Sequence, residues 1–125
     1  MVSDQPQRSY VTFEDLVSEA LDSLPEEFAA KMENVEVVVE DEPPREMLAQ
    51  LPRGTTLLGL YHGIPLTQRG VYSNALPDKI SIYRGPIVRM ARTPDEIRRQ
   101  VRKTVIHEIG HYFGISDERL HELGW

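Results

Sequence analysis

The chain has 125 residues, of which 40% are hydrophobic and 27% are charged. This composition is typical of one globular domain and excludes a disordered or fibrous protein. The chain contains no cysteine, so disulfides and thiolate metal ligands are both excluded. Its net charge of −6 is uneven, because residues 1–46 contain 13 acidic and 3 basic residues, whereas the remainder contains 7 acidic and 11 basic residues. We expect these two parts to neutralise each other rather than to bind nucleic acid, since the protein as a whole is acidic.

The N-terminus lacks the apolar pattern of a folded element. We therefore expect a flexible tail over residues 1–9, followed by a single domain over residues 10–125. Neither a secretory signal nor an apolar run of membrane-spanning length is present in the sequence, so we expect a cytoplasmic protein that does not contact membranes.

The first half of the chain predicts helices around one strand. Thr12 is suited to cap a helix, because apolar residues recur at helical spacing from Phe13 to Leu24. One or two further helical turns are expected within residues 26–32. Val35 to Glu40 alternates and is rich in valine, which predicts a strand. A short helix is expected at residues 45–50, within a long connection.

Two more strands are predicted in the middle of the chain. The first covers Thr55 to Tyr61, and the second covers Lys79 to Tyr83, with an extension over Ile87 to Arg89. The connection between them, Gly63 to Asp78, is long for a compact domain, and loops of this length are often functional.

The last third predicts a long helix followed by a short one. Thr93 and Glu96 form a capping box around Pro94, which is a strong signal for a helix start. The helix should run to about Phe113 and stop at Gly114. From residue 104 onward its apolar residues surround the axis, which indicates that this half is buried. A glycine within it, at residue 110, predicts that another part of the protein packs closely against the helix.

The buried half of this helix carries a pattern that can hold a metal ion. His107 and His111 are four residues apart, so both imidazoles project from one face and can reach a single ion. Glu108 lies about 100° further round the helix, where it is better placed to act on a water molecule than to complete the same coordination shell. Two histidines and an adjacent glutamate at this spacing indicate a catalytic zinc site with a general base.

A third ligand has to come from the residues after the helix. Gly114 allows the backbone to reverse, and Asp117 follows three residues later, where its carboxylate can approach from outside the helix. Glu118, His121 and Glu122 are alternatives. Two histidines and one carboxylate leave a fourth position open, which is the catalytic rather than the structural arrangement of zinc.

The segment from Leu57 to Trp125 resembles the minimal zincin-like metallopeptidase family of bacteria. The resemblance rests on three motifs, which are Gly59-Leu60-Tyr61-His62-Gly63-Ile64-Pro65-Leu66-Thr67, Leu76-Pro77-Asp78-Lys79-Ile80-Ser81-Ile82-Tyr83-Arg84-Gly85-Pro86, and His107 to Asp117 with its tail Glu118 to Gly124. It implies a compact α+β zincin-like domain, in which a small mixed sheet packs against a long metal-bearing helix. It also implies that His107, His111 and Asp117 bind Zn²⁺ and that Glu108 is the catalytic base.

The resemblance implies a zinc metallopeptidase that acts on a peptide or protein substrate. Such a substrate would lie along a sheet edge, which suits the Lys79–Tyr83 strand or its neighbour. Tyr72 and Tyr83 are candidates for stabilising an oxyanion, although we expect both in the core or on a sheet face. His62 stands where such proteins often have an acidic residue, and we expect it in a surface loop rather than in contact with substrate. The alternatives are a non-catalytic zinc-binding module and a nucleic-acid-associated protein that uses the basic residues of the long helix, Arg98, Arg99, Arg102 and Lys103.

Overall fold

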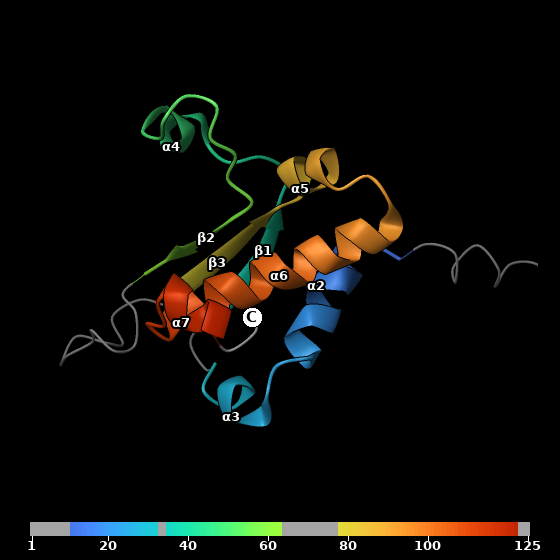
Figure 1. Cartoon of the computed structure of the whole chain (residues 1–125), viewed down its shortest axis with the longest axis vertical. Coiled ribbons are helices and arrows are strands. Elements are labelled where there is room, and N and C mark those ends of the chain that lie inside the picture. Colours follow the sequence, from blue (N-terminus) through green and yellow to red (C-terminus); the bar gives the residue numbers. More distant parts are fainter. Residues whose placement is uncertain (1–10, 33–34, 64–77, 123–125) are drawn as a thin grey trace, which may run out of the picture.

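The protein is described here by a computed structural model, which covers residues 11–32, 35–63 and 78–122 (Figure 1). The expected tail at residues 1–9 lies outside these ranges, as does nearly all of the expected loop between Gly63 and Asp78.

Three strands form one small mixed sheet. They are β1 (Val35–Glu40), β2 (Gly59–His62) and β3 (Asp78–Tyr83), in the spatial order β1-β3-β2. The central strand β3 is parallel to β1 and antiparallel to β2. The sheet and the helices around it confirm the predicted α+β fold class.

Two helices lie on one face of this sheet. Helix α2 (Phe13–Asp22) begins at the Thr12 capping box, as predicted, and packs beside the long helix α6 (Pro94–Tyr112) (Figure 1). Between the helices and the sheet lies the hydrophobic core, whose buried members are Phe13, Val17, Ala20, Leu24, Ile80, Ile82, Ile87, Val101, Val105, Ile106 and Ile109. The side chains of Ile80 and Ile82 point from β3 toward α6, so the other face of the strand carries Lys79, Ser81 and Tyr83.

Short helices connect these elements. They are α3 (Glu26–Ala29), α4 (Arg45–Ala49), α5 (Arg84–Met90) and α7 (Asp117–Glu122). Helix α4 projects from one end of the fold and contacts it through Met47, whose Sδ lies 4.0 Å from the hydroxyl of Tyr83, whereas α7 lies at the C-terminal end of α6 (Figure 1). Within the described ranges, no helix is both long and apolar enough to cross a membrane.

Two predictions around β3 are wrong. The chain from Ile87 to Arg89 does not extend the strand, because residues 84–90 form helix α5, and Pro86 has the fixed φ that suits a first helical turn. Strand β2 begins at Gly59 rather than Thr55. Gly59 pairs with Ile82, so a strand that began at residue 55 would need partners beyond Tyr83, where the chain is already helical.

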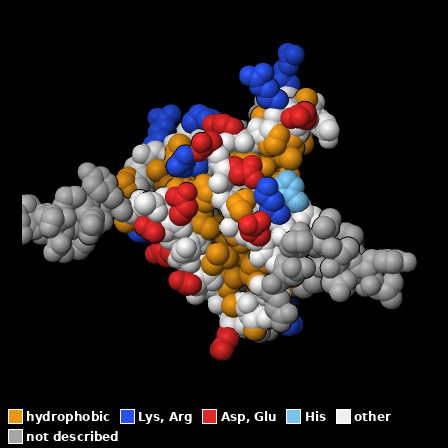
Figure 2. Space-filling view, turned by 180° about the vertical axis from the view of Figure 1, so that it is seen from behind, with side chains coloured by type: hydrophobic (Ala, Val, Ile, Leu, Met, Phe, Trp, Pro, Cys, Tyr) orange, Lys and Arg blue, Asp and Glu red, His pale blue; other side chains and the backbone are white. Residues whose placement is uncertain are grey.

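Ion pairs join the acidic N-terminal part of the chain to the basic C-terminal part. Arg98 Nε lies 3.0 Å from Glu19 Oε1, and Arg89 Nη1 lies 2.7 Å from Glu42 Oε2. Seen from behind, basic and acidic side chains stand next to one another on the same face (Figure 2). The opposite charges of the two parts are thus partly paired within one molecule.

Candidate metal centre

The two histidines lie on the C-terminal half of helix α6. Its N-terminus is fixed by the predicted capping box, in which Thr93 Oγ1 accepts from the backbone of Glu96 at 3.1 Å. Val105 and Ile109 are fully buried, which confirms that this half of the helix is buried. His107 and His111 are half-buried on it, so both imidazoles remain within reach of solvent.

The turn after α6 reverses the chain as predicted. Gly114 has φ +75°, a conformation that favours glycine, and its N–H donates to His111 O at 2.9 Å. The N–H of Ile115 donates to Gly110 O at 2.8 Å, and together these bonds form a Schellman motif. Helix α7 then starts at Asp117.

Asp117 meets both histidines at one point. Its Oδ1 lies 3.1 Å from His107 Nε2 and 3.1 Å from His111 Nε2. The two rings are 4.6 Å apart between centroids and inclined at 72°, so they converge edge to face rather than stack. Two imidazole nitrogens and one carboxylate oxygen thus surround a common position. The Asp117 side chain is 73% exposed, which leaves that position open to solvent.

These donors fit a zinc ion in both type and spacing. Imidazole nitrogen and carboxylate oxygen are both common zinc ligands. With bonds of about 2.0–2.1 Å, tetrahedral ligand atoms lie about 3.3 Å apart. Each of the two separations from Asp117 Oδ1 is within a few tenths of an ångström of that value. His107, His111 and Asp117 could therefore hold zinc with little rearrangement.

Glu108 approaches the same site from a different side. It is buried, and its Oε1 lies 3.1 Å from His111 Nδ1, on the other nitrogen of the ring from the one that faces Asp117. Its carboxylate is close enough to the two histidines that one atom from each of the three residues lies within 4.8 Å of the others. A proton on His111 Nδ1 donates to Glu108 and leaves Nε2 with a free lone pair, which is the tautomer that a metal ligand needs.

The contacts also shift the protonation of the site. Burial lowers the pKa of His111, but the hydrogen bond to Asp117 and the nearby Glu108 carboxylate raise it more, so that the net shift is upward. The hydrogen bond to His111 holds the pKa of Asp117 below its ordinary value. Because a metal-ligating imidazole has to be deprotonated, the raised pKa of His111 makes protons stronger competitors of an arriving cation.

Comparison with known proteins identifies the family of this chain. The family described as zincin-like metallopeptidase matches residues 32–125, which is most of the chain. The chain belongs to this family. Among solved structures, it is similar to a conserved hypothetical protein from Thermo thermophilus, with 25% sequence identity and a TM-score of 0.55 over 90% of this chain and 94% of that chain. No curated protein matches it.

The other residues considered for this zincin-like site lie elsewhere. Glu118, His121 and Glu122 make no contact with either histidine within the described part of the chain, and Glu122 accepts from Arg119 at 2.9 Å. Tyr83 is buried on the far face of the sheet, where burial raises the pKa of its hydroxyl. Tyr72 lies outside the described residues.

His62 differs from the expectation, because it ends strand β2 instead of lying in a loop. It is half-buried, and its Nε2 lies 3.3 Å from Ser81 Oγ. Since Ser81 is on the face of β3 that points away from α6, His62 does not face the zincin-like site.

Sequence reasoning missed the hollow beside the candidate centre. This hollow, of about 320 Å³, lies between α6 and the start of β2 and is lined by Leu57, Leu58, Gly59, Met90, Gln100, Lys103, Thr104, His107 and Glu108. Gly59 brings the two elements together, because an added Cβ would lie 2.8 Å from Thr104 Cγ2 and 3.2 Å from Glu108 Cγ. Gly59 stood in a motif of the resemblance, but only the packing of strand against helix gives its physical role.

Proposed function

We propose that this zincin-like protein is a zinc-dependent peptidase. The observation that carries the proposal is the approach of Asp117 Oδ1 to 3.1 Å from the Nε2 atoms of both His107 and His111. This donor set leaves a coordination position open, which distinguishes catalytic from structural zinc sites. The buried carboxylate of Glu108 beside it supplies the second requirement of peptide hydrolysis, a base.

Each residue has a separate part in the proposed reaction. His107, His111 and Asp117 hold the zinc ion, which when bound supplies Lewis acidity that polarises a carbonyl and acidifies water. Glu108 takes a proton from the attacking water and passes it to the leaving amine. Its Oε1 is engaged with His111 Nδ1, while Oε2 has no hydrogen-bond partner among the described residues. We assign the proton transfer to Oε2.

The sheet offers an edge for the substrate backbone. The Lys79–Tyr83 strand is central, so a peptide cannot add to it, whereas its neighbour β2 is an edge strand in the described sheet. Strand β2 passes beside Glu108 at Gly59, so a peptide paired with β2 would lie next to the base. The hollow lined by Leu57, Leu58 and Met90 adjoins this path, and we propose that it receives an apolar substrate side chain.

A non-catalytic zinc-binding module is the second candidate. It is favoured by the contact between Glu108 Oε1 and His111 Nδ1, which is the orienting role that carboxylates commonly have around metal-bound histidines. In that case Glu108 fixes the histidine ring and moves no proton.

The Glu108→Gln variant distinguishes the two functions. Both variant and wild type are reconstituted with zinc, and their metal content is measured before a broad peptide library is digested and analysed by mass spectrometry. We expect equal zinc in both proteins, cleavage by the wild type, and a loss of at least about 100-fold in Glu108→Gln. Stoichiometric zinc without cleavage by the wild type would establish the non-catalytic module. Failure to bind zinc, with His107→Ala as the blank, would contradict both.

A further inference from the structure

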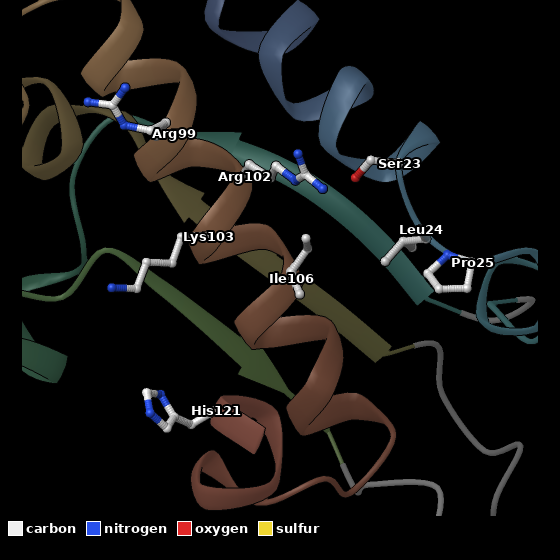
Figure 3. A pocket seen from close by; sticks show the side chains of 8 residues that line it. All are labelled: Ser23, Leu24, Pro25, Arg99, Arg102, Lys103, Ile106 and His121. Carbon is white, nitrogen blue, oxygen red and sulfur yellow. The ribbon is translucent and has the colours of Figure 1, made fainter. Parts of the chain in front are cut away.

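A second hollow, of about 610 Å³, lies on the solvent side of α6 and is bordered by basic side chains (Figure 3). Arg99, Arg102 and Lys103 line it from α6, with Arg102 pointing toward Ser23 and Lys103 toward the other side of the helix, and His121 lines it from α7 (Figure 3). Ile106 of α6 and the chain at the end of α2, Ser23 to Pro25, complete its lining. The hollow thus combines an apolar base with a positively charged border.

Among the described residues, no acidic side chain forms an ion pair with this border, and Glu96 is only a more distant electrostatic partner of Arg99. None of the three cations has an ion pair within the described residues, although the adjacent Arg98 is paired with Glu19 at 3.0 Å. Arg99 is spaced three and four residues from Arg102 and Lys103, and like charges at these spacings destabilise a helix. The cations therefore leave a local positive potential, which extends over about 8–10 Å at physiological salt and complements an anionic ligand.

The basic hollow shares a lining residue with the hollow beside the candidate metal centre. Lys103 lines both this hollow and the smaller one that contains His107 and Glu108. Arg99, Lys103 and His107 follow one another at intervals of four along the same face of α6. With a rise of about 1.5 Å per residue, Lys103 lies about 6 Å and Arg99 about 12 Å along the helix axis from His107.

We propose that this surface binds acidic side chains of the peptide substrate and thereby selects acidic peptides. An extended peptide advances about 3.3 Å per residue. The distances of Lys103 and Arg99 from His107 along the helix axis therefore place the acidic side chains about two and about four residues from the cleaved bond, on one side of it. This inference rests on the proposed peptidase function, since it gives the substrate class of the same site.

A peptide fits this surface better than a nucleic acid does. The apolar base formed by Leu24 and Ile106 suits aliphatic side chains, whereas phosphate binding calls for a longer basic track. The protein as a whole is acidic, with a net charge of −6, which disfavours a long phosphate backbone that would extend beyond the three cations. An acidic peptide, in contrast, needs only the three cations of the hollow to bind its side chains.

The test measures binding without hydrolysis. Zinc-loaded Glu108→Gln protein is titrated into a fluorescent peptide that has glutamates at the second and fourth positions from a central apolar pair, and into the matched glutamine peptide. Binding is followed by anisotropy at low and high salt. One exposed ion pair contributes up to about fivefold in affinity, so we expect the glutamate peptide to bind about tenfold more tightly, with a preference that falls at high salt.

Three double variants in the Glu108→Gln background separate local contacts from net charge. Arg99→Glu with Lys103→Glu should abolish the preference for glutamate, and Arg99→Gln with Lys103→Gln should remove most of it. Arg45→Glu with Arg53→Glu changes the net charge equally at exposed positions on and after α4, away from the hollow, and should leave the preference intact. Melting curves verify that each variant is folded.

Equal binding of the two peptides, or an equal loss in both charge-reversed variants, would overturn the inference. Tighter binding of an oligonucleotide than of the acidic peptide, lost in Arg99→Glu with Lys103→Glu, would also overturn it and assign the surface to nucleic acid. Failure of the peptidase proposal gives a different result from failure of this inference. If acidic peptides bind as expected but the zinc-loaded wild type cleaves none of them, the binding surface stands and catalysis does not.

Discussion

Leu120 of α7 packs directly over Gly110 of α6, so that a Cβ at residue 110 would lie 2.6 Å from Leu120 Cδ2. Leu120 is almost fully buried by this contact. Helix α7 begins with Asp117, so the contact that positions Leu120 against α6 also determines the position of the Asp117 carboxylate. The closeness of the two helices is therefore a condition for the convergence of Asp117 on both histidines.

Gly110→Ala should weaken zinc binding. In an exposed helix the change would stabilise by about 1 kcal/mol, but here the methyl group overlaps a buried side chain, and overpacking costs about 1–3 kcal/mol. We expect Leu120 to be displaced together with α7, so that zinc affinity falls while α6 remains helical. Competition with a chromophoric chelator measures the affinity, and circular dichroism measures the helix.

The Leu120→Ala background tests whether steric overlap is the cause. It removes the atoms that a Cβ at residue 110 would meet, so the further change Gly110→Ala should cost much less zinc affinity there than in the wild type. An undiminished loss in that background would show that Gly110 acts in some other way than by admitting Leu120.

A second close approach places the base. Gly59→Ala introduces a Cβ that would meet Thr104 Cγ2 at 2.8 Å and Glu108 Cγ at 3.2 Å. We expect a destabilisation of about 1–3 kcal/mol and a drop in kcat that exceeds any change in zinc content, because the carboxylate of Glu108 is displaced. Urea unfolding and steady-state peptide hydrolysis measure the two effects.

Thr104→Ser provides the matched control for this change, because it deletes the nearest atom and keeps the hydroxyl that accepts from Gln100 at 3.1 Å. Combined with Gly59→Ala, it should restore part of the lost stability, since the backbone oxygen of Ser81 remains 3.1 Å from the new Cβ. The kinetic defect should recover less, since Glu108 Cγ remains close to the new methyl group. If the combined variant is as unstable as Gly59→Ala alone, the contact with Thr104 is not the cause of the destabilisation.

The sequence correctly predicted those features that depend only on neighbouring residues. Three predicted features depend on residues that are close together in sequence, and the structure has each of them at the predicted place. They are the Thr93–Glu96 capping box, the i,i+4 histidines and the turn at Gly114. The features that were missed depend on residues far apart in sequence. Strand β2 starts late because the chain after β3 forms α5. The role of Gly59 depends on Ser81, Thr104 and Glu108, all of which approach it closely in the fold.

Removal of zinc should loosen α7 more than α6. Asp117 is the proposed ligand that joins the two helices, and among the described residues its carboxylate has only the histidines as partners. A ligand that binds only the folded state stabilises it by about 2.7 kcal/mol at 100 times its Kd. We therefore expect chelation to lower Tm and to accelerate amide exchange in residues 117–122, with little change in residues 101–109.

Asp117→Asn is the comparison for that experiment. It preserves size but weakens zinc binding, so its exchange pattern with zinc present should resemble that of the chelated wild type. Glu118→Gln, a neighbouring exposed acid without contacts to the histidines, should behave as the wild type. If chelation leaves exchange in α7 unchanged, Asp117 does not hold the metal.

Glu40 lies on the face of the sheet that points away from α6, and it should make the free energy of unfolding depend on pH at acidic pH. Its Oε2 lies 3.1 Å from Lys79 Nζ and accepts from Ser81 Oγ at 2.9 Å. The bond to Lys79 lowers the pKa of Glu40 below its ordinary value, against an opposing effect of burial. Because the folded-state pKa is the lower one, this stabilisation is complete above the ordinary value of 4.5 and is lost as the pH falls through the folded-state value.

Glu40→Gln should accordingly destabilise the protein by up to about 1 kcal/mol at neutral pH, as expected for a pair that is partly exposed. The difference from the wild type should shrink below pH 4.5 and vanish once Glu40 is protonated in the folded state. Urea unfolding at a series of pH values measures it. Glu36→Gln removes an exposed acid from the same strand face and should show no such convergence. A penalty for Glu40→Gln that stays constant into acid would mean that packing of the side chain, and not its charge, stabilises the sheet.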